Sequence, residues 1–130
     1  MKNQFPVKVL LGFLFLVILF HLSIVVGAIP YDLAWGGRLQ TETEMYVFEA
    51  VSILVNLLLV SVLLMKGDFI KFHFKKRTIK VILWVFFALF ILNTLGNLMA
   101  RTNFEKGFAV ITLIFAILIF MINKRDPNTD

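Results

Sequence analysis

The chain alternates four long apolar segments with short polar ones. Positions 9–20 hold no polar side chain, and positions 81–92 and 108–122 are nearly as uniform. A hydrocarbon core of about 30 Å requires about 20 predominantly apolar residues per helical span. The pattern therefore predicts an all-α fold, a transmembrane four-helix bundle with spans at about 5–28, 45–65, 79–100 and 107–123.

Two local signals refine the ends of these spans. Pro30 cannot continue a helix, so it closes the first span. The stretch 41–44, Thr-Glu-Thr-Glu, fits a capping box with Thr41 as N-cap and Glu44 reaching back. We therefore expect the second helix to begin slightly before its apolar run.

Composition leaves little room for a soluble domain. The 130 residues are 60% hydrophobic and 16% charged, against about 45–50% apolar and about 25% charged in average soluble chains. We expect a single integral membrane domain over residues 1–130. Cysteine is absent, and only two histidines are present, which argues against disulfides and structural zinc. With no catalytic set or nucleotide-binding loop either, we expect no enzyme activity, no metal and no cofactor.

Lysine and arginine concentrate on one side of the predicted spans. Ten of them fall in the N-terminal tail, the connection between spans two and three, and the C-terminal tail: Lys2, Lys8, Lys66, Lys71, Lys75, Lys76, Arg77, Lys80, Lys124 and Arg125. Three fall on the other side: Arg38, Arg101 and Lys106. By the positive-inside rule both termini are cytoplasmic, as expected of a multi-pass protein of the bacterial cytoplasmic (inner) membrane.

The first span has an alternative interpretation as a signal peptide. Its basic start and the small residues 26–28, Val-Gly-Ala, are typical of such a peptide. Signal peptides, however, usually carry an apolar core of about 7–15 residues, and this segment is longer. We therefore expect the span to be retained. Cleavage would leave three spans.

Polar residues interrupt the second and third spans on one face each. Glu49, Ser52 and Asn56 follow at helical spacing and form one stripe. A second stripe consists of Asn93, Asn97 and Arg101, at intervals of four. Gly96 and Ala100 flank it, and small residues of this kind let another helix approach closely.

The two stripes are expected at matching depth in the outer half of the membrane. Together with His21 they predict a polar pocket there, in which a buried Glu49 needs a partner such as Arg101 or Arg38. His21 and Ser23 point to opposite sides of the first span, so at most one can face the bundle. The alternative is that these residues only hydrogen-bond the helices together. His21 itself either switches charge near neutral pH or simply bonds a neighbouring helix.

The first outer loop, 29–40, combines aromatic residues with a glycine pair. Aromatic rings favour the membrane–water boundary, and the glycine pair permits a tight turn that flanking charges can tie together. Such a loop serves either as a lid over the pocket or as an interfacial anchor. The candidate lid residues are Tyr31, Asp32, Trp35, Gly36, Gly37 and Arg38.

Two sequence elements resemble a known family. They are His21-Leu-Ser with Gly-Ala-Ile-Pro-Tyr-Asp-Leu-Ala-Trp-Gly-Gly-Arg at 27–38, and Asn-Thr-Leu-Gly-Asn at 93–97 followed by Glu105-Lys106. They are similar to a family of small, uncharacterised bacterial four-span membrane proteins with a Gly-Gly-Arg or Gly-Gly-Lys turn after the first helix. The chain departs from it in having Tyr31-Asp32 where Gly-Glu is usual. The resemblance implies the architecture and a bacterial origin, and it draws attention to Trp35, Gly36, Gly37, Arg38, Asn97 and Glu105.

The connection 66–80 interleaves cations with Phe69, Phe72 and Phe74. Each juxtamembrane cation contributes about 1 kcal/mol of attraction to an anionic leaflet. We expect contact with anionic lipids and no nucleic acid.

These patterns leave two functional hypotheses. The first is an outward-facing binding or transport module for a lipophilic or small ligand, with transport requiring a homo-oligomer. The alternative is an accessory subunit that contacts a larger membrane protein through the nearly uniform fourth span.

Overall fold

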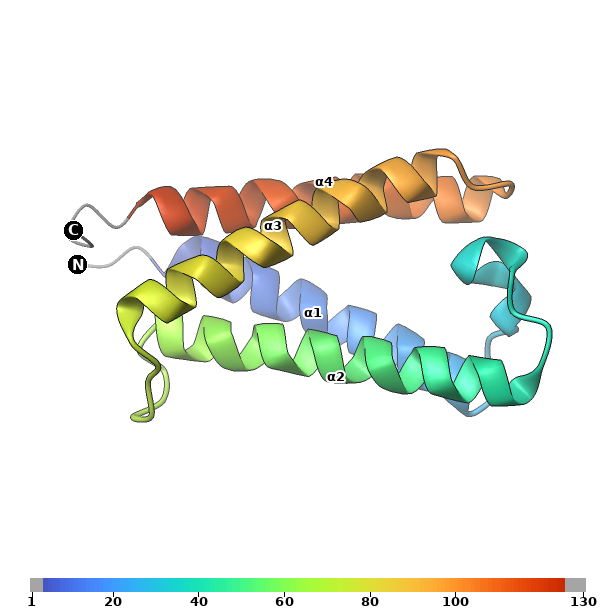
Figure 1. Ribbon diagram of the computed structural model, residues 1–130, viewed down its shortest axis with the longest axis horizontal. Coiled ribbons are helices and arrows are strands. Elements are labelled where there is room, and N and C mark those ends of the chain that lie inside the picture. The colour runs from blue at the N-terminus through green and yellow to red at the C-terminus, as the bar shows by residue number, and fades with distance from the viewer. Residues whose placement is uncertain (1–3, 126–130) are drawn as a thin grey trace.

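The computed structural model describes residues 4–125, and the regular structure within that range is helical (Figure 1). The four long helices are α1 (Phe5–Val25), α2 (Glu42–Lys66), α3 (Lys76–Leu98) and α4 (Asn103–Lys124). Two short 3-10 turns, η1 (Tyr31–Leu33) and η2 (Trp35–Gly37), lie between α1 and α2. All four long helices are long and apolar enough to cross a membrane, so the predicted fold class is confirmed. Lys2 lies outside the described residues.

Helix α1 ends three residues before the predicted limit because of Gly27. This glycine adopts a positive φ of 78°, and the backbone N–H groups of Ala28 and Ile29 turn back to the carbonyl of Ser23. A left-handed residue with such return bonds is a common way to end a helix. Pro30 therefore follows a helix that has already ended.

Helices α2 and α4 begin with the same kind of cap. Thr41 Oγ1 accepts the N–H of Glu44 at 3.1 Å, as predicted. The Glu44 carboxylate accepts the N–H of Gln40 rather than that of Thr41, at 2.8 Å. Thr102 caps α4, where its hydroxyl accepts the N–H of Glu105 and donates to the Glu105 carboxylate. This second cap starts α4 four residues before the predicted limit of 107.

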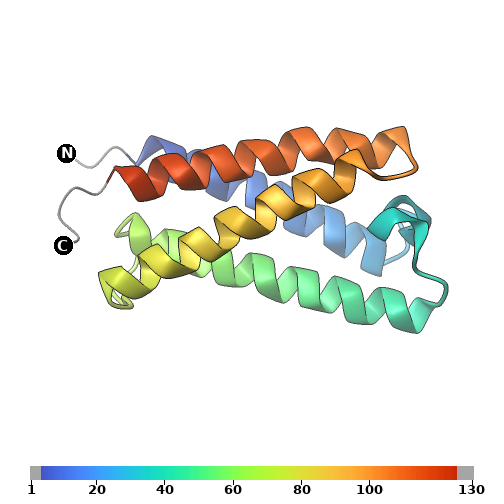
Figure 2. The same cartoon turned by 45° about the horizontal axis from the view of Figure 1, so that its top comes forward.

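The four helices form two hairpins. Helix α1 packs along α2, and α3 packs along α4. We call the end with the 67–75 connection the basic end and the end with residues 26–41 and 99–102 the loop end. In both views α3 starts beside α2 at the basic end and diverges from it toward the loop end (Figures 1 and 2). The hairpins are therefore closed at one end and separated at the other.

The apolar core follows the same division. Its main cluster draws on all four helices in the half next to the basic end, with Leu10, Leu59, Leu83 and Ile119 fully buried. At the loop end a much smaller cluster of Ile24, Leu39 and Met45 holds the 26–41 loop against α1 and α2. Between the two clusters, the centre of the bundle holds a cavity.

Candidate functional site

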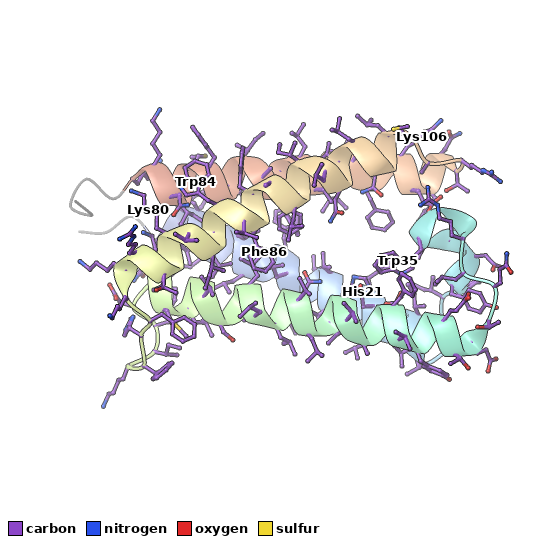
Figure 3. All side chains as sticks on the ribbon, viewed as in Figure 1. His21, Trp35, Lys80, Trp84, Phe86 and Lys106 are labelled. Atoms are coloured by element: carbon purple, nitrogen blue, oxygen red, sulfur yellow. The ribbon has the colours of Figure 1, made fainter. Side chains whose placement is uncertain are left out.

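A cavity of about 1320 Å³ occupies the space where the two hairpins separate. Cavities that hold drug-sized ligands measure about 300–1,000 Å³, so this one is large enough for a lipid-sized molecule. Its walls come from all four helices and from the η1–η2 loop. The side chains of Trp35 and His21 lie in this half of the molecule, and those of Trp84 and Phe86 lie nearer the basic end (Figure 3).

Glu49 is fully buried in this half of the molecule and is hydrogen-bonded through its carboxylate group. Its side chain is 0% exposed, and both carboxylate oxygens have partners. Oε2 lies 2.5 Å from His21 Nδ1, and Oε1 accepts the indole N–H of Trp35 at 3.0 Å. A carboxylate in a membrane interior is costly unless it is paired. The prediction of a partner is therefore confirmed, but the partners are His21 and Trp35 and not Arg101 or Arg38.

His21 reaches Glu49 because of its angular position on α1. It points into the bundle, whereas the Ser23 hydroxyl donates to the carbonyl of Leu19 on its own helix. The Nδ1 atom donates when the carboxylate is ionised, and Glu49 donates when its carboxyl group is protonated. The pair joins α1 to α2 about 10 Å from the start of α2, at 1.5 Å per residue.

Trp35 brings the outer loop into this cluster. Its φ is 57°, a left-handed conformation that is rare for a bulky residue. The indole ring packs edge-on against Phe48 at 5.0 Å between centroids, and its N–H meets Glu49. Such backbone conformations persist only where surrounding contacts impose them. Trp35 thus gives the 26–41 loop a polar attachment to α2 in addition to the apolar cluster of Leu39 and Met45.

The rest of the predicted lid divides into two groups. Gly37 and Arg38 line the cavity together with Trp35, and Gly36 lies between them in η2. Tyr31 and Asp32 are not part of the cavity wall. Tyr31 packs against the small cluster at the loop end. Within residues 4–125 no ion pair joins Asp32 to Arg38, so the expected tie across the turn is absent.

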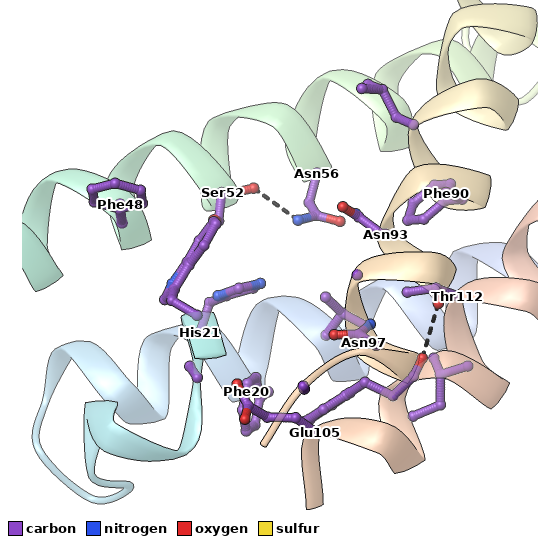
Figure 4. A pocket seen from close by; sticks show the side chains of 18 of the residues that line it. Phe20, His21, Phe48, Ser52, Asn56, Phe90, Asn93, Asn97, Glu105 and Thr112 are labelled. Atoms are coloured by element: carbon purple, nitrogen blue, oxygen red, sulfur yellow. Dashed lines mark hydrogen bonds between the residues drawn. The ribbon is translucent and has the colours of Figure 1, made fainter. Parts of the chain in front are cut away.

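Both polar stripes face the cavity except for one residue, Glu49. Ser52, Asn56, Asn93, Asn97 and Arg101 line it, as does His21, whereas Glu49 lies behind His21 and Trp35 and does not. Asn56 and Asn93 point toward one another from α2 and α3 (Figure 4).

The polar side chains on the cavity wall contribute little to holding α2 and α3 together. Asn56 Nδ2 donates to the carbonyl of Ser52 on its own helix. In the part of the chain that the structure describes, the side chains of Ser52, Asn93 and Asn97 hydrogen-bond no other residue. A direct side-chain link between helices is made instead within one hairpin, by Thr94 on α3 and Thr112 on α4, whose hydroxyls lie 2.9 Å apart.

Gly96 does not serve a close helix contact, contrary to expectation. A Cβ built on it would meet nothing within 4 Å, and both Gly96 and Ala100 line the cavity. The predicted contact fails because α3 diverges from α2 at this level. The small residues widen the cavity instead.

Glu105, which only the family resemblance brought forward, is part of the cavity wall and is 4% exposed. Its carboxylate accepts the Thr102 hydroxyl at 2.8 Å. The signal that identifies it is Thr102-Asn-Phe-Glu105, a second capping box that the pattern analysis missed.

Among residues 4–125, four charged side chains line the cavity, all toward the loop end: Arg38, Glu44, Arg101 and Glu105. Both carboxylates are engaged at helix N-termini, where negative charge is stabilised. Arg38 and Arg101 have no ion pair among residues 4–125. Over that range no three His, Asp or Glu side chains gather as a metal site would require.

Comparison with protein-family models, with curated proteins and with solved structures finds no match to this chain.

Proposed function

We propose that the protein is a non-enzymatic binding module for an amphipathic molecule of the membrane, which it holds in the cavity between the hairpins. The observation that carries the proposal is a set of polar side chains that line a cavity of this size without hydrogen-bonding the protein. Buried or half-buried polar groups normally find partners. Ser52 and Asn97 are half-buried and have no partner among the described residues, so we expect a bound molecule or water to supply one; Asn93 is exposed on the same wall and also has none.

The polarity of the wall changes along the bundle axis. Arg38 and Arg101 lie toward the loop end, and the amide and hydroxyl groups follow below them. Next to the main core the wall is apolar, with Phe86, Phe90 and Phe115. A lipid has the same order of polarity, from headgroup to chain. By the positive-inside rule the loop end faces outward, so the ligand would come from the outer leaflet.

The wall also reaches the lipid-facing surface. Val55 on α2 and Leu92 on α3 line the cavity and are exposed. In both views the two helices diverge there. A molecule in the bilayer can therefore reach the cavity sideways, with its chain remaining in an apolar environment throughout.

An accessory role through α4 has no specific observation in its favour. Large apolar side chains are exposed on all four helices, for example Leu16, Leu54, Leu92 and Val110, as expected wherever a helix faces lipid. They do not gather on α4.

The test uses Trp35 as a reporter. The chain has two tryptophans, so Trp84→Phe leaves Trp35, which lines the cavity, as the single tryptophan. In nanodiscs, equal amounts of chain-brominated phosphatidylglycerol and phosphatidylcholine are added at low mole fraction to unbrominated lipid. We expect quenching of Trp35 that saturates, because a site fills, whereas bulk lipid gives quenching that grows steadily.

A matched pair of glycine variants controls the experiment. Gly96→Phe fills the cavity, and Gly12→Phe places the same side chain outside it; a Cβ at either position meets nothing within 4 Å. The saturable quenching should disappear in the first variant and persist in the second. Steady, unsaturable quenching in both would reject the proposal.

A further inference from the structure

We infer that the ligand of this cavity carries a headgroup of net negative charge, whose phosphate or carboxylate Arg38 and Arg101 bind at the loop end. The inference rests on the proposed function and specifies its ligand class. It follows from a difference in the cavity wall between the carboxylates, which have partners within the protein, and the guanidinium groups, which form no ion pair among residues 4–125.

The wall contains as many carboxylates as guanidinium groups, but only the carboxylates are engaged. Glu44 accepts the Gln40 N–H at 2.8 Å. Glu105 accepts the Thr102 hydroxyl at 2.8 Å and is 4% exposed. Each belongs to the first turn of its helix, where the helix dipole also stabilises negative charge. Their charge is therefore partly satisfied within the protein.

The two arginines are in the opposite situation. Arg38 follows η2, and Arg101 lies three residues beyond the end of α3. Both are exposed and line the cavity, and neither forms an ion pair within residues 4–125. Glu49, the one carboxylate to which either was expected to bind, is occupied by His21 and Trp35. A guanidinium group offers up to five donors in a planar fork that matches phosphate and carboxylate oxygens.

The amides below the arginines extend the same preference. Asn93 and Asn97 each present two N–H donors on the cavity wall. The headgroup of phosphatidylglycerol supplies phosphate oxygens with a net negative charge, whereas in phosphatidylcholine a quaternary ammonium group offsets the phosphate charge and adds no acceptor. The apolar wall beneath requires that the anion carry a hydrocarbon chain. A free anion would use the arginines and leave that wall empty.

The experiment separates the two lipids that the first test combines. In the Trp84→Phe protein, brominated phosphatidylglycerol and brominated phosphatidylcholine are titrated individually into nanodiscs of unbrominated phosphatidylcholine. We expect half-saturation with phosphatidylglycerol at a mole fraction about tenfold lower, the factor that corresponds to 1.4 kcal/mol of added binding.

A charge-matched pair of double variants assigns the preference to the arginines. Arg38→Gln with Arg101→Gln should make the two titrations coincide. Lys75→Gln with Arg77→Gln removes the same charge from the basic end and should leave the tenfold preference intact. Equal loss in both double variants would mean that net charge, and not this site, attracts the lipid, and would overturn the inference.

The remaining outcomes are distinguishable. Saturable but equal quenching by both lipids overturns the anionic headgroup and leaves the binding module standing. The absence of saturable quenching by either lipid rejects both proposals. Complete displacement of brominated phosphatidylglycerol by millimolar inorganic phosphate would show that the chain is not required, and would overturn the amphiphile in favour of a free anion.

Discussion

The two halves of this bundle are built from the same four helices and differ in how they are filled. Next to the basic end, Leu10, Leu59, Leu83 and Ile119 close the interior completely. Toward the loop end the interior is a cavity of about 1320 Å³ with amides on its walls. Similar hydropathy in all four spans thus yields a packed half and an open half.

The difference shows what keeps a membrane helix bundle open. Apolar side chains interdigitate at the basic end, so the hairpins meet. At the loop end the 26–41 loop lies against α1 and α2, attached through Trp35 and Glu49. With small residues such as Gly96 on the facing helix, the side chains of residues 4–125 leave the cavity between the hairpins unfilled. The open half is therefore the place where we propose that the ligand binds.

The largest expected effect concerns the side of the membrane on which each half lies. The chain has no cysteine, so Thr43→Cys at the loop end and Thr78→Cys at the basic end each introduce a single exposed thiol. A membrane-impermeant maleimide applied to intact cells should label the first variant and not the second, because the basic end is predicted to be cytoplasmic. The second should be labelled after permeabilisation. The reverse pattern would invert the predicted topology.

The next effect compares packing in the two halves on one helix. Leu83 on α3 is 0% exposed, and Leu92, nine residues later, is 63% exposed. Leu83→Ala should lower the free energy of unfolding by about 2–5 kcal/mol, because it leaves a void in a filled core. Leu92→Ala should change it by less than about 0.5 kcal/mol, as an exposed site does. Unfolding in detergent measures both, and similar losses would mean that the open half is as tightly packed as the other.

The smallest effect concerns the attachment of the loop. Glu49→Gln keeps the shape of the side chain and removes its charge, so the bonds to His21 and Trp35 weaken. Hydrogen bonds to charged groups contribute about 1.5–3 kcal/mol, and we expect a loss at the lower end of that range. Limited proteolysis should then cut the 31–41 segment faster, and the emission of Trp35 should shift toward that of a solvated indole.

Glu44→Gln is the control for this last prediction. Glu44 is exposed, and a glutamine can still accept the Gln40 N–H in the cap. Glu44→Gln should leave both the rate of proteolysis of the 31–41 segment and the emission of Trp35 unchanged. Equal proteolysis of the two variants would show that Glu49 does not hold the loop.

Several features of the fold and of the cavity wall follow from the sequence alone. The apolar runs fix four spans, and the Thr41 cap places the start of α2. Helical spacing fixes which side chains share a face, so both polar stripes emerge on one side of their helices. The cost of a carboxylate in lipid requires that Glu49 have a partner. Each of these depends on one helix and its solvent.

The tertiary structure decided everything that depends on the distance between helices. It brought Glu49 to His21 and Trp35, removed Glu49 from the cavity wall, and left Gly96 facing open space. The periodicity of a helix determines the direction of each side chain about its own axis. It does not determine how far away the next helix lies, because that distance results from packing along the whole bundle and from the loop that separates the hairpins.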